Sequence, residues 1–189
     1  MMARPRSDEK RSAIMKAAIA IIAAQGTSAP TAMIAKEAGV SNGALFTYFE
    51  TKAELLNQLY KELKTEMALS TTVGLPTHAD MHDQVLHVWN GWLNWAVANP
   101  QKRCVLAHLG VSNEVTTASR QAVGEVYADV EALLDRSRAN GPLRDAPLMF
   151  VATLVTGMLD ATVDYIARDP AGADSHAAAG FRALLRILG

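Results

Sequence analysis

The stretch Thr31-Ala32-Met33-Ile34-Ala35-Lys36-Glu37-Ala38-Gly39-Val40-Ser41-Asn42-Gly43-Ala44-Leu45-Phe46-Thr47-Tyr48-Phe49 decides how the N-terminal part of the chain folds. Its pattern predicts two short helices, which are too short to be stable in isolation. We therefore expect them to pack against each other and against the helix before them. Gly39 falls where a tight turn needs a left-handed residue, and Ser41 can cap the second helix. This arrangement is a helix-turn-helix.

Each of the two helices has an apolar side and a polar side. The inner face of the first consists of Ile34, Ala35 and Ala38, and that of the second consists of Leu45 and Phe49, at spacing i, i+4. The outward positions of the second helix carry small or hydrogen-bonding side chains, as a helix that reads the major groove of DNA requires. These positions are Asn42, Gly43, Ala44, Thr47 and Tyr48. The alternative is a helical hairpin with no role in DNA binding.

Residues 8–56 resemble the DNA-binding domain of TetR/AcrR-type regulators. Behind Thr31, the family pattern Ile-Ala-x-x-Ala-Gly-Val-Ser-x-Gly-x-Leu-Tyr-x-Tyr-Phe-x-x-Lys-x-x-Leu is met through Leu55 with one departure, Phe46 in place of Tyr. The resemblance implies a DNA-contacting set in which Thr31, Tyr48 and Lys52 contact phosphates and Asn42, Ala44 and Thr47 contact base edges. Gly43 would allow close approach to DNA, and Ser41 would offer a helix N-terminus. Phe46 can pack against a sugar or a thymine methyl group, but it lacks the phenol that would donate to phosphate.

Charge is divided unevenly along the chain, whose net charge is −1. Residues 1–52 carry seven Lys or Arg and four Asp or Glu, whereas residues 53–189 carry eleven and fifteen. Arg4, Arg6, Lys10 and Arg11 form a basic arm that leads into the first helix. We expect residues 1–52 to form the helix-turn-helix DNA-binding domain and residues 53–189 to form a helical ligand-binding and dimerisation domain.

Helix signals continue to the end of the chain, and no stretch alternates with period two for long enough to predict a sheet. We expect an all-α fold of about nine helices, with helices outside the helix-turn-helix near 8–25, 52–67, 79–98, 101–109, 113–139, 145–168 and 174–188. The expected N-caps of three of them are Ser7, Ser112 and Asp145. A single cysteine, Cys104, excludes an internal disulfide and fits a reducing cytoplasm. Asp, Arg or Pro interrupts the long apolar stretches, so we expect a cytoplasmic protein with no membrane contact.

Three tryptophans within seven residues, Trp89, Trp92 and Trp95, indicate the wall of a ligand cavity. In the family that the chain resembles, the helix in this position and the next two enclose such a cavity. Contributions from other helices extend the candidate ligand-binding set to Cys104, His108, Tyr127 and Met158. The alternative is that these large side chains simply fill the core.

The helix near 145–168 is apolar on more than one side, which indicates that it is buried by more than its own subunit. Thr153, Gly157 and Ala161 form a stripe of small residues along it, and Gly180 and Leu184 lie on the last helix. We expect these five residues to form a homodimer interface across a two-fold axis, as the resemblance also implies. Packing within a monomer is the alternative.

We find no catalytic constellation, and we expect no enzyme activity, no cofactor and no metal. His78 and His82 are four residues apart but lack the glutamate of a zinc motif. The expected function is that of a ligand-responsive repressor, released from a palindromic operator in double-stranded DNA when a small, largely apolar effector binds. Two rivals remain: an activator or co-repressor-dependent regulator of the same fold, and a helical enzyme or carrier without DNA binding.

Overall fold

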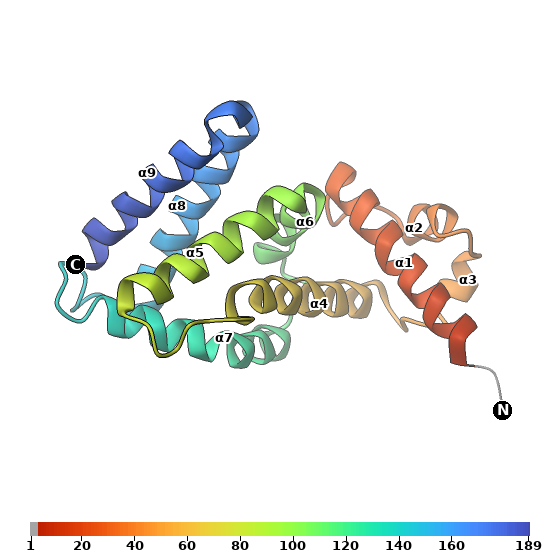
Figure 1. Ribbon diagram of the computed structural model, residues 1–189. Helices are drawn as coiled ribbons and strands as arrows, with labels where there is room; N and C mark the ends of the chain where they lie inside the picture. Colours follow the sequence, from red (N-terminus) through yellow and green to blue (C-terminus); the bar gives the residue numbers. More distant parts are fainter. Residues whose placement is uncertain (1–3) are drawn as a thin grey trace. The chain divides into compact units, whose positions relative to one another are not determined.

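The computed structural model describes residues 4–189, with side chains from residue 7 onward, as nine α-helices and one short 3-10 helix and without a strand in that range (Figure 1). The expected all-α class and helix number are confirmed. The elements in chain order are α1 (Arg4–Gln25), α2 (Thr31–Glu37), α3 (Asn42–Leu45), α4 (Lys52–Thr72), α5 (Met81–Ala98), α6 (Pro100–Gly110), α7 (Thr117–Ser137), α8 (Leu148–Arg168), η1 (Pro170–Gly172) and α9 (Ala173–Leu188).

Three expected N-caps lie elsewhere, each for a local reason. Helix α1 begins at Arg4 rather than after Ser7, with Pro5 in its first turn, where proline is tolerated. The Ser112 hydroxyl accepts a hydrogen bond from Glu114 N in a turn, and Thr116 caps α7 by accepting from Ser119 N (3.2 Å). Pro147 disfavours helical backbone at the residue before it, so α8 begins at Leu148 and not after Asp145.

The chain divides into two compact units, and two helices contribute to both. Unit 1 comprises residues 1–64 and 100–123, and unit 2 comprises residues 65–99 and 124–189. Helices α4 and α7 therefore begin in unit 1 and end in unit 2. Residue 52, after which we expected the boundary, lies inside unit 1.

The core of unit 1 is a continuous apolar cluster around α1. Helix α1 packs against α2 and α6, and α2 packs against α3 (Figure 1). Its fully buried side chains come from each of these helices and from the start of α4, and they are Ile14, Ile22, Ile34, Leu45, Phe49, Leu55, Leu56, Leu59, Val105 and Leu109. This cluster supports the two short helices, which could not hold their shape alone.

Unit 2 is built on α5, α8 and α9, with α8 and α9 running side by side (Figure 1). Gly91 on α5 allows a close approach to the end of α4, because a Cβ atom there would lie 2.1 Å from Ser70 O. Gly141, in the turn between α7 and α8, is similarly packed against the end of α9, since its Cβ would meet Leu188 O at 1.6 Å. No side chain larger than glycine fits at either position without moving backbone.

Helix α8 is long and apolar enough to cross a membrane by length and composition alone, with a mean hydropathy of 1.3 over its apolar window. This differs from the expectation that charged residues or proline break every such stretch. Asp160 and Asp164 lie within the helix, and α8 packs against α5 and α9 inside unit 2. Core helices pass the same test, so the feature is not evidence for a membrane protein.

Candidate functional site

The turn between α2 and α3 has the backbone that its sequence predicts. Gly39 adopts a φ of +68°, which is in the left-handed region that favours glycine. Gly39 N donates to Lys36 O (3.1 Å) and Val40 N donates to Ala35 O (2.9 Å), so the last carbonyls of α2 are satisfied within the turn. The chain thus reverses direction while these two carbonyls keep a hydrogen-bond partner.

Helix α3 is shorter than expected but is capped as expected. The Ser41 hydroxyl accepts a hydrogen bond from Ala44 N at 3.1 Å, and regular helix extends only from Asn42 to Leu45. Turns follow, in which Tyr48 N and Phe49 N both donate to Leu45 O (3.0 and 3.1 Å). Leu45 is fully buried and Phe49 is 1% exposed, so these two side chains fix the segment on the core of unit 1.

Burial of those two side chains leaves the opposite face of the segment accessible. Asn42, Gly43, Phe46 and Thr47 are exposed, and Ala44 and Tyr48 are partly exposed. A Cβ atom added at Gly43 would meet nothing within 4 Å, so its surroundings are open. The Thr47 hydroxyl donates to Ala44 O (2.7 Å), which fixes the orientation of its side chain and leaves the oxygen free to accept. The exposed face is uncharged and rich in small and hydrogen-bonding groups.

The other predicted phosphate contacts lie at helix starts. Thr31 is the first residue of α2, and Lys52 is the first residue of α4; both are partly exposed. Thr51 caps α4 by accepting from Glu54 N (3.0 Å), while the Glu54 carboxylate reaches back to Glu50 N (2.6 Å). The amide groups of this first turn are therefore held in a fixed geometry beside Lys52.

Part of the predicted basic arm has a structural role. Arg11 forms an ion pair with Glu62, and its guanidinium lies 5.5 Å from the centre of the Phe49 ring. Lys10 is exposed. The side chains of Arg4 and Arg6 lie outside the described residues. Arg11 thus ties α1 to α4 and to the end of the helix-turn-helix.

Asn57 is a buried polar residue that the sequence reading missed. Its amide nitrogen donates to Ala53 O and to Glu114 O, each at 2.7 Å, and its oxygen accepts from Thr116 N at 2.9 Å. Asn57 is 9% exposed, so these bonds form largely away from water and join α4 to the segment between α6 and α7. The sequence offered one signal for a buried polar residue, namely an asparagine among the leucines of one helix face.

Unit 2 contains a cavity between α5, α7, α8 and α9. Its volume is about 70 Å³, and it is lined by Val85, Val88, Trp89, Val130, Leu133, Leu134, Ser137, Val155, Leu159, Leu184 and Leu188. Trp89 alone, of the predicted ligand-binding residues, lies in this lining. Sequence reasoning missed the others because aliphatic residues at helical spacing also fill ordinary cores.

The remaining predicted ligand-binding residues are distributed over both units. In unit 2, Trp92 and Trp95 are buried beside α5's other core positions, and Trp95 Nε1 donates to Glu66 Oε1 (3.0 Å). Tyr127 on α7 and Met158 on α8 are partly buried. Cys104 and His108 are exposed residues of α6 in unit 1. The Cys104 thiol contacts Ala23 O (3.7 Å) on α1.

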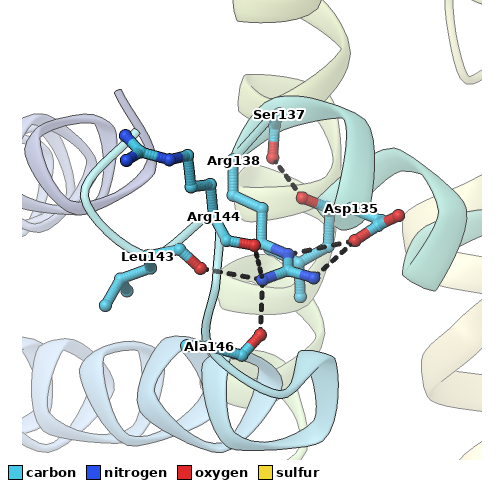
Figure 2. A network of polar contacts seen from close by, with 7 residues as sticks. Asp135, Ser137, Arg138, Leu143, Arg144 and Ala146 are labelled. Carbon is cyan, nitrogen blue, oxygen red and sulfur yellow. Dashed lines mark hydrogen bonds and ion pairs between the residues drawn. The ribbon is translucent and has the colours of Figure 1, made fainter. Parts of the chain in front are cut away.

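Arg138 follows the cavity-lining Ser137 and forms an arginine clamp on the turn between α7 and α8 (Figure 2). Arg138 is 9% exposed; its Nη1 donates to the carbonyls of Leu143, Arg144 and Ala146 at 2.6–3.0 Å. Its Nη2 and Nε donate to Asp135 Oδ1 (2.7 and 3.0 Å). One side chain thus contacts three carbonyls of the turn between α7 and α8 and ties that turn to the end of α7.

The predicted dimer residues divide between the surface and the interior of unit 2. Thr153, Gly157 and Ala161 are exposed on α8, where they lie among other accessible apolar side chains such as Phe150 (52% exposed) and Leu154 (38%). Leu184 is 2% exposed and lines the cavity. A Cβ atom at Gly180 would lie 2.8 Å from Trp89 Cζ2, so Gly180 faces the indole within the same unit.

The exposed residues Asp80, His82 and Asp83 place one ligand atom each within 4.8 Å of one another. His78 is not part of this group. Asp80 caps α5 by accepting from Asp83 N (2.9 Å), which accounts for the proximity of the two carboxylates.

Comparison with known proteins agrees with this geometry. Residues 14–59 match the family model of bacterial regulatory proteins of the TetR family. A protein from Shewanella sp. PV-4, described as a TetR family transcription regulator, is 28% identical; the match covers 93% of this chain and 96% of that one, with a TM-score of 0.82.

Two further solved structures share the fold. A TetR family transcription regulator from Marinobacter aquaeolei VT8 is 19% identical over 97% of both chains, with a TM-score of 0.84. The transcriptional regulator FadR from Bacillus subtilis, in complex with stearoyl-CoA, is 19% identical over 94% of this chain and 97% of that one, with a TM-score of 0.67. The chain therefore has an N-terminal helix-turn-helix that matches the TetR family model, and along most of its length it shares its fold with solved structures of TetR family transcription regulators.

Proposed function

We propose that the chain is a cytoplasmic, homodimeric repressor that binds a pseudo-palindromic operator and is released when a small, largely apolar molecule binds in unit 2. The observation that carries the DNA-binding half of this proposal is the exposed face of the segment from Asn42 to Tyr48. Its groups can contact base edges, whereas its apolar side chains are buried in unit 1.

Phosphate contacts would position this face on the duplex. The first turns of α2 and α4 present amide groups beside Thr31 and Lys52, and helix N-termini attract phosphate. The Ser41 hydroxyl accepts from Ala44 N and keeps its own proton available for a phosphate oxygen. Phe46, 39% exposed, would contact a sugar or a thymine methyl group.

A homodimer would place two such faces on one operator. The exposed apolar side of α8 supports this, because a helix accessible along Phe150, Leu154 and Gly157 leaves apolar surface that a second copy would cover. The stripe of Thr153, Gly157 and Ala161 would let two helices approach closely. In a dimer, the two reading segments must be separated by about one turn of DNA, roughly 34–36 Å, or somewhat more.

Effector binding would act through α4, which contributes to both units. The Trp-bearing helix α5 contacts the end of α4 directly through Gly91. A ligand that displaces the cavity wall and prefers the altered conformation would shift α4 and change the separation of the reading segments. That FadR from Bacillus subtilis forms a complex with stearoyl-CoA supports a ligand role for this fold. The proposed function involves no catalysis.

An electrophoretic mobility shift assay with DNA from the region upstream of the protein's own gene tests the proposal. We expect a retarded complex that survives an excess of unrelated duplex and weakens as salt rises, since about 0.9 counterions are released per phosphate contacted. Equal binding to all duplexes, or no retardation at low salt, would contradict it. Binding that requires a small molecule would instead indicate a co-repressor-dependent regulator.

A further inference from the structure

The exposed face of residues 42–48 carries no charged side chain, because no Asp, Glu, Lys or Arg occurs between Glu37 and Glu50. The nearest lysines in the sequence, Lys36 and Lys52, belong to α2 and α4. Arginine and lysine are the side chains that most often read guanine in the major groove, since they donate to both O6 and N7. This face therefore lacks the usual means of selecting a G·C pair.

Asn42 supplies the carboxamide of this face. It is exposed at the first position of α3, and the N-terminal residues of a recognition helix are those that contact base edges. Its oxygen accepts and its nitrogen donates, and an adenine edge offers the complementary pair, a donor at N6 and an acceptor at N7. At a guanine edge, O6 and N7 are both acceptors, so the carboxamide oxygen would face another acceptor. Asn42 is therefore suited to adenine.

The Thr47 hydroxyl is turned toward its own backbone, because it donates to Ala44 O at 2.7 Å. Its proton is thus engaged within the segment and is not available to O6 or N7 of a guanine. Thr47 is exposed, so its γ-methyl group and an oxygen that can only accept remain for a base edge. Like Asn42, Thr47 offers a guanine no pair of donors.

Two further residues add apolar surface to the same face. Phe46 is 39% exposed, and Ala44 is partly exposed. In the major groove, the C5-methyl group of thymine is the apolar feature of the base edges, and Ala, Phe and the Thr methyl group are the side chains that contact it. Three such residues occur between positions 44 and 47, so the face is suited to thymine.

An A·T pair satisfies both kinds of group at once. Its adenine offers N6 and N7 to a carboxamide, and its thymine offers a methyl group, whereas a G·C pair has no methyl group. Gly43 keeps the approach to the bases open. A Cβ atom there would meet nothing within 4 Å, so glycine leaves free the space between Asn42 and Ala44 that a side chain would occupy.

We propose that the exposed face of residues 42–48 selects A·T pairs in each operator half-site. Asn42 binds adenine through N6 and N7, and the apolar groups of Phe46 and Thr47, with Ala44 beside them, contact thymine methyl groups. The proposal rests on the proposed function in taking duplex DNA as the partner, and it adds which bases the face reads. Phosphate contacts from other residues contribute affinity but carry no base preference.

Selection from a duplex library, with a random core long enough for two half-sites, identifies the preferred bases without a known operator. The full-length wild-type protein is compared with Asn42→Ala and with the matched control Asn90→Ala, at an exposed asparagine of α5 in unit 2. We expect the wild type and Asn90→Ala to enrich the same half-sites, and Asn42→Ala to lose the preference for adenine at one or more positions in each. G·C pairs at these Asn42-dependent positions, or an unchanged profile in Asn42→Ala, would overturn the proposal.

A modified adenine in the enriched duplex tests the contact of Asn42. 7-Deazaadenine lacks the N7 acceptor but still pairs with thymine, and fluorescence anisotropy measures the dissociation constants. At an Asn42-dependent adenine, we expect this base to weaken wild-type binding by about fivefold, the value of one ordinary hydrogen bond. The same base should weaken Asn42→Ala by less than about twofold, because that variant has no contact to lose. Equal weakening of both proteins would overturn the role of Asn42.

Deoxyuridine in place of single thymines tests the methyl contacts, because it removes only the C5-methyl group. We expect at least one thymine in each half-site at which this replacement weakens wild-type binding by about fourfold, the value of burying one methyl group. The double variant Phe46→Ala/Thr47→Ser, which keeps a hydroxyl at position 47, should respond by less than about twofold. Insensitivity of every thymine, or the same loss in the double variant at every sensitive one, would overturn the assignment of these apolar groups.

Failure of this inference and failure of the proposed function are distinguishable in the same selection. If the wild-type protein enriches no sequence, sequence-specific regulation is contradicted, and the inference falls with it. If a sequence is enriched but the Asn42-dependent positions are G·C pairs, or none depends on Asn42, the base assignment alone is overturned and the regulator assignment stands.

Discussion

The helix-turn-helix in unit 1 and the cavity in unit 2 use apolar side chains in opposite ways. In the helix-turn-helix, fully buried Leu45 and Phe49 leave no space and force small polar groups outward. In unit 2, apolar side chains from four helices meet without filling the space between them, and a donor on Trp89 is left unused. One region presents groups to a large external partner, and the other is suited to enclosing a small one.

Truncating a leucine in each region tests this difference in packing. We expect Leu45→Ala to cost about 4 kcal/mol, within the range of buried leucine truncations, because every side of Leu45 is in contact. Leu133→Ala, at a cavity-lining residue that is 2% exposed, should cost only about 2 kcal/mol, since part of its surface already faces empty space.

Hydrogen exchange of amides within each unit, measured against urea, gives the two free energies of opening. A larger loss for Leu133→Ala than for Leu45→Ala would contradict the proposed contrast.

Removing the arginine clamp tests how the turn between α7 and α8 in unit 2 is held. Arg138→Ala leaves three loop carbonyls without a donor, and we expect it to lower the free energy of unfolding by about 3 kcal/mol. The matched control is Arg144→Ala, whose side chain is 60% exposed and should change stability by less than about 0.5 kcal/mol. Thermal denaturation of the two variants measures the difference, and equal effects would refute the role of the clamp.

A charge placed on α8 tests whether the outer surface of unit 2 is an interface. We expect Leu154→Glu to weaken self-association by about 2 kcal/mol, or roughly thirtyfold, because two carboxylates would face each other in an apolar contact. Leu69→Glu, on α4 at a more exposed position, should leave association unchanged. Sedimentation equilibrium of both variants and the wild-type protein measures the association constant. A monomeric wild-type protein at micromolar concentration would contradict the homodimer.

Lys52→Ala tests the outer surface of unit 1. We expect weaker binding to every duplex by about 1 kcal/mol and a smaller salt dependence, with no change in sequence preference. Arg182→Ala, which removes the same charge from an exposed position on α9, serves as the control. Titrations over a range of salt concentrations check both. A loss confined to one DNA sequence would contradict a phosphate contact.

The contrast also explains which parts of the molecule could be predicted from sequence. Gly39, Ser41 and the spacing of Leu45 and Phe49 act within a few residues of each other, so the turn, the cap and the outward face follow from local rules. The length of α3 does not follow from local rules, because the turns after Leu45 depend on how Phe49 packs in the core of unit 1.

The cavity and the buried polar contacts could not be predicted, because they depend on tertiary packing. The cavity draws on residues as distant in sequence as Val85 and Leu188, and nothing local distinguishes a valine beside a void from one in a filled core. Trp89 was predicted because of its size and its neighbours. The sequence could not show that Trp89 lines the cavity whereas Trp95 donates its Nε1 proton to Glu66 on another helix. The bonds of Arg138 and Asn57 likewise depend on loops that sequence reading leaves undefined.

The most direct test of the central claim, that the exposed face of residues 42–48 reads operator sequence, is a competition titration of the double variant Asn42→Ala/Thr47→Ala. Fluorescence anisotropy measures binding to the upstream operator and to a scrambled duplex of equal length at one salt concentration. We predict that the variant keeps its affinity for the scrambled duplex and loses most of its preference for the operator, since each lost base contact is worth about 1–3 kcal/mol. A folded variant that still prefers the operator as strongly as the wild-type protein would contradict the claim.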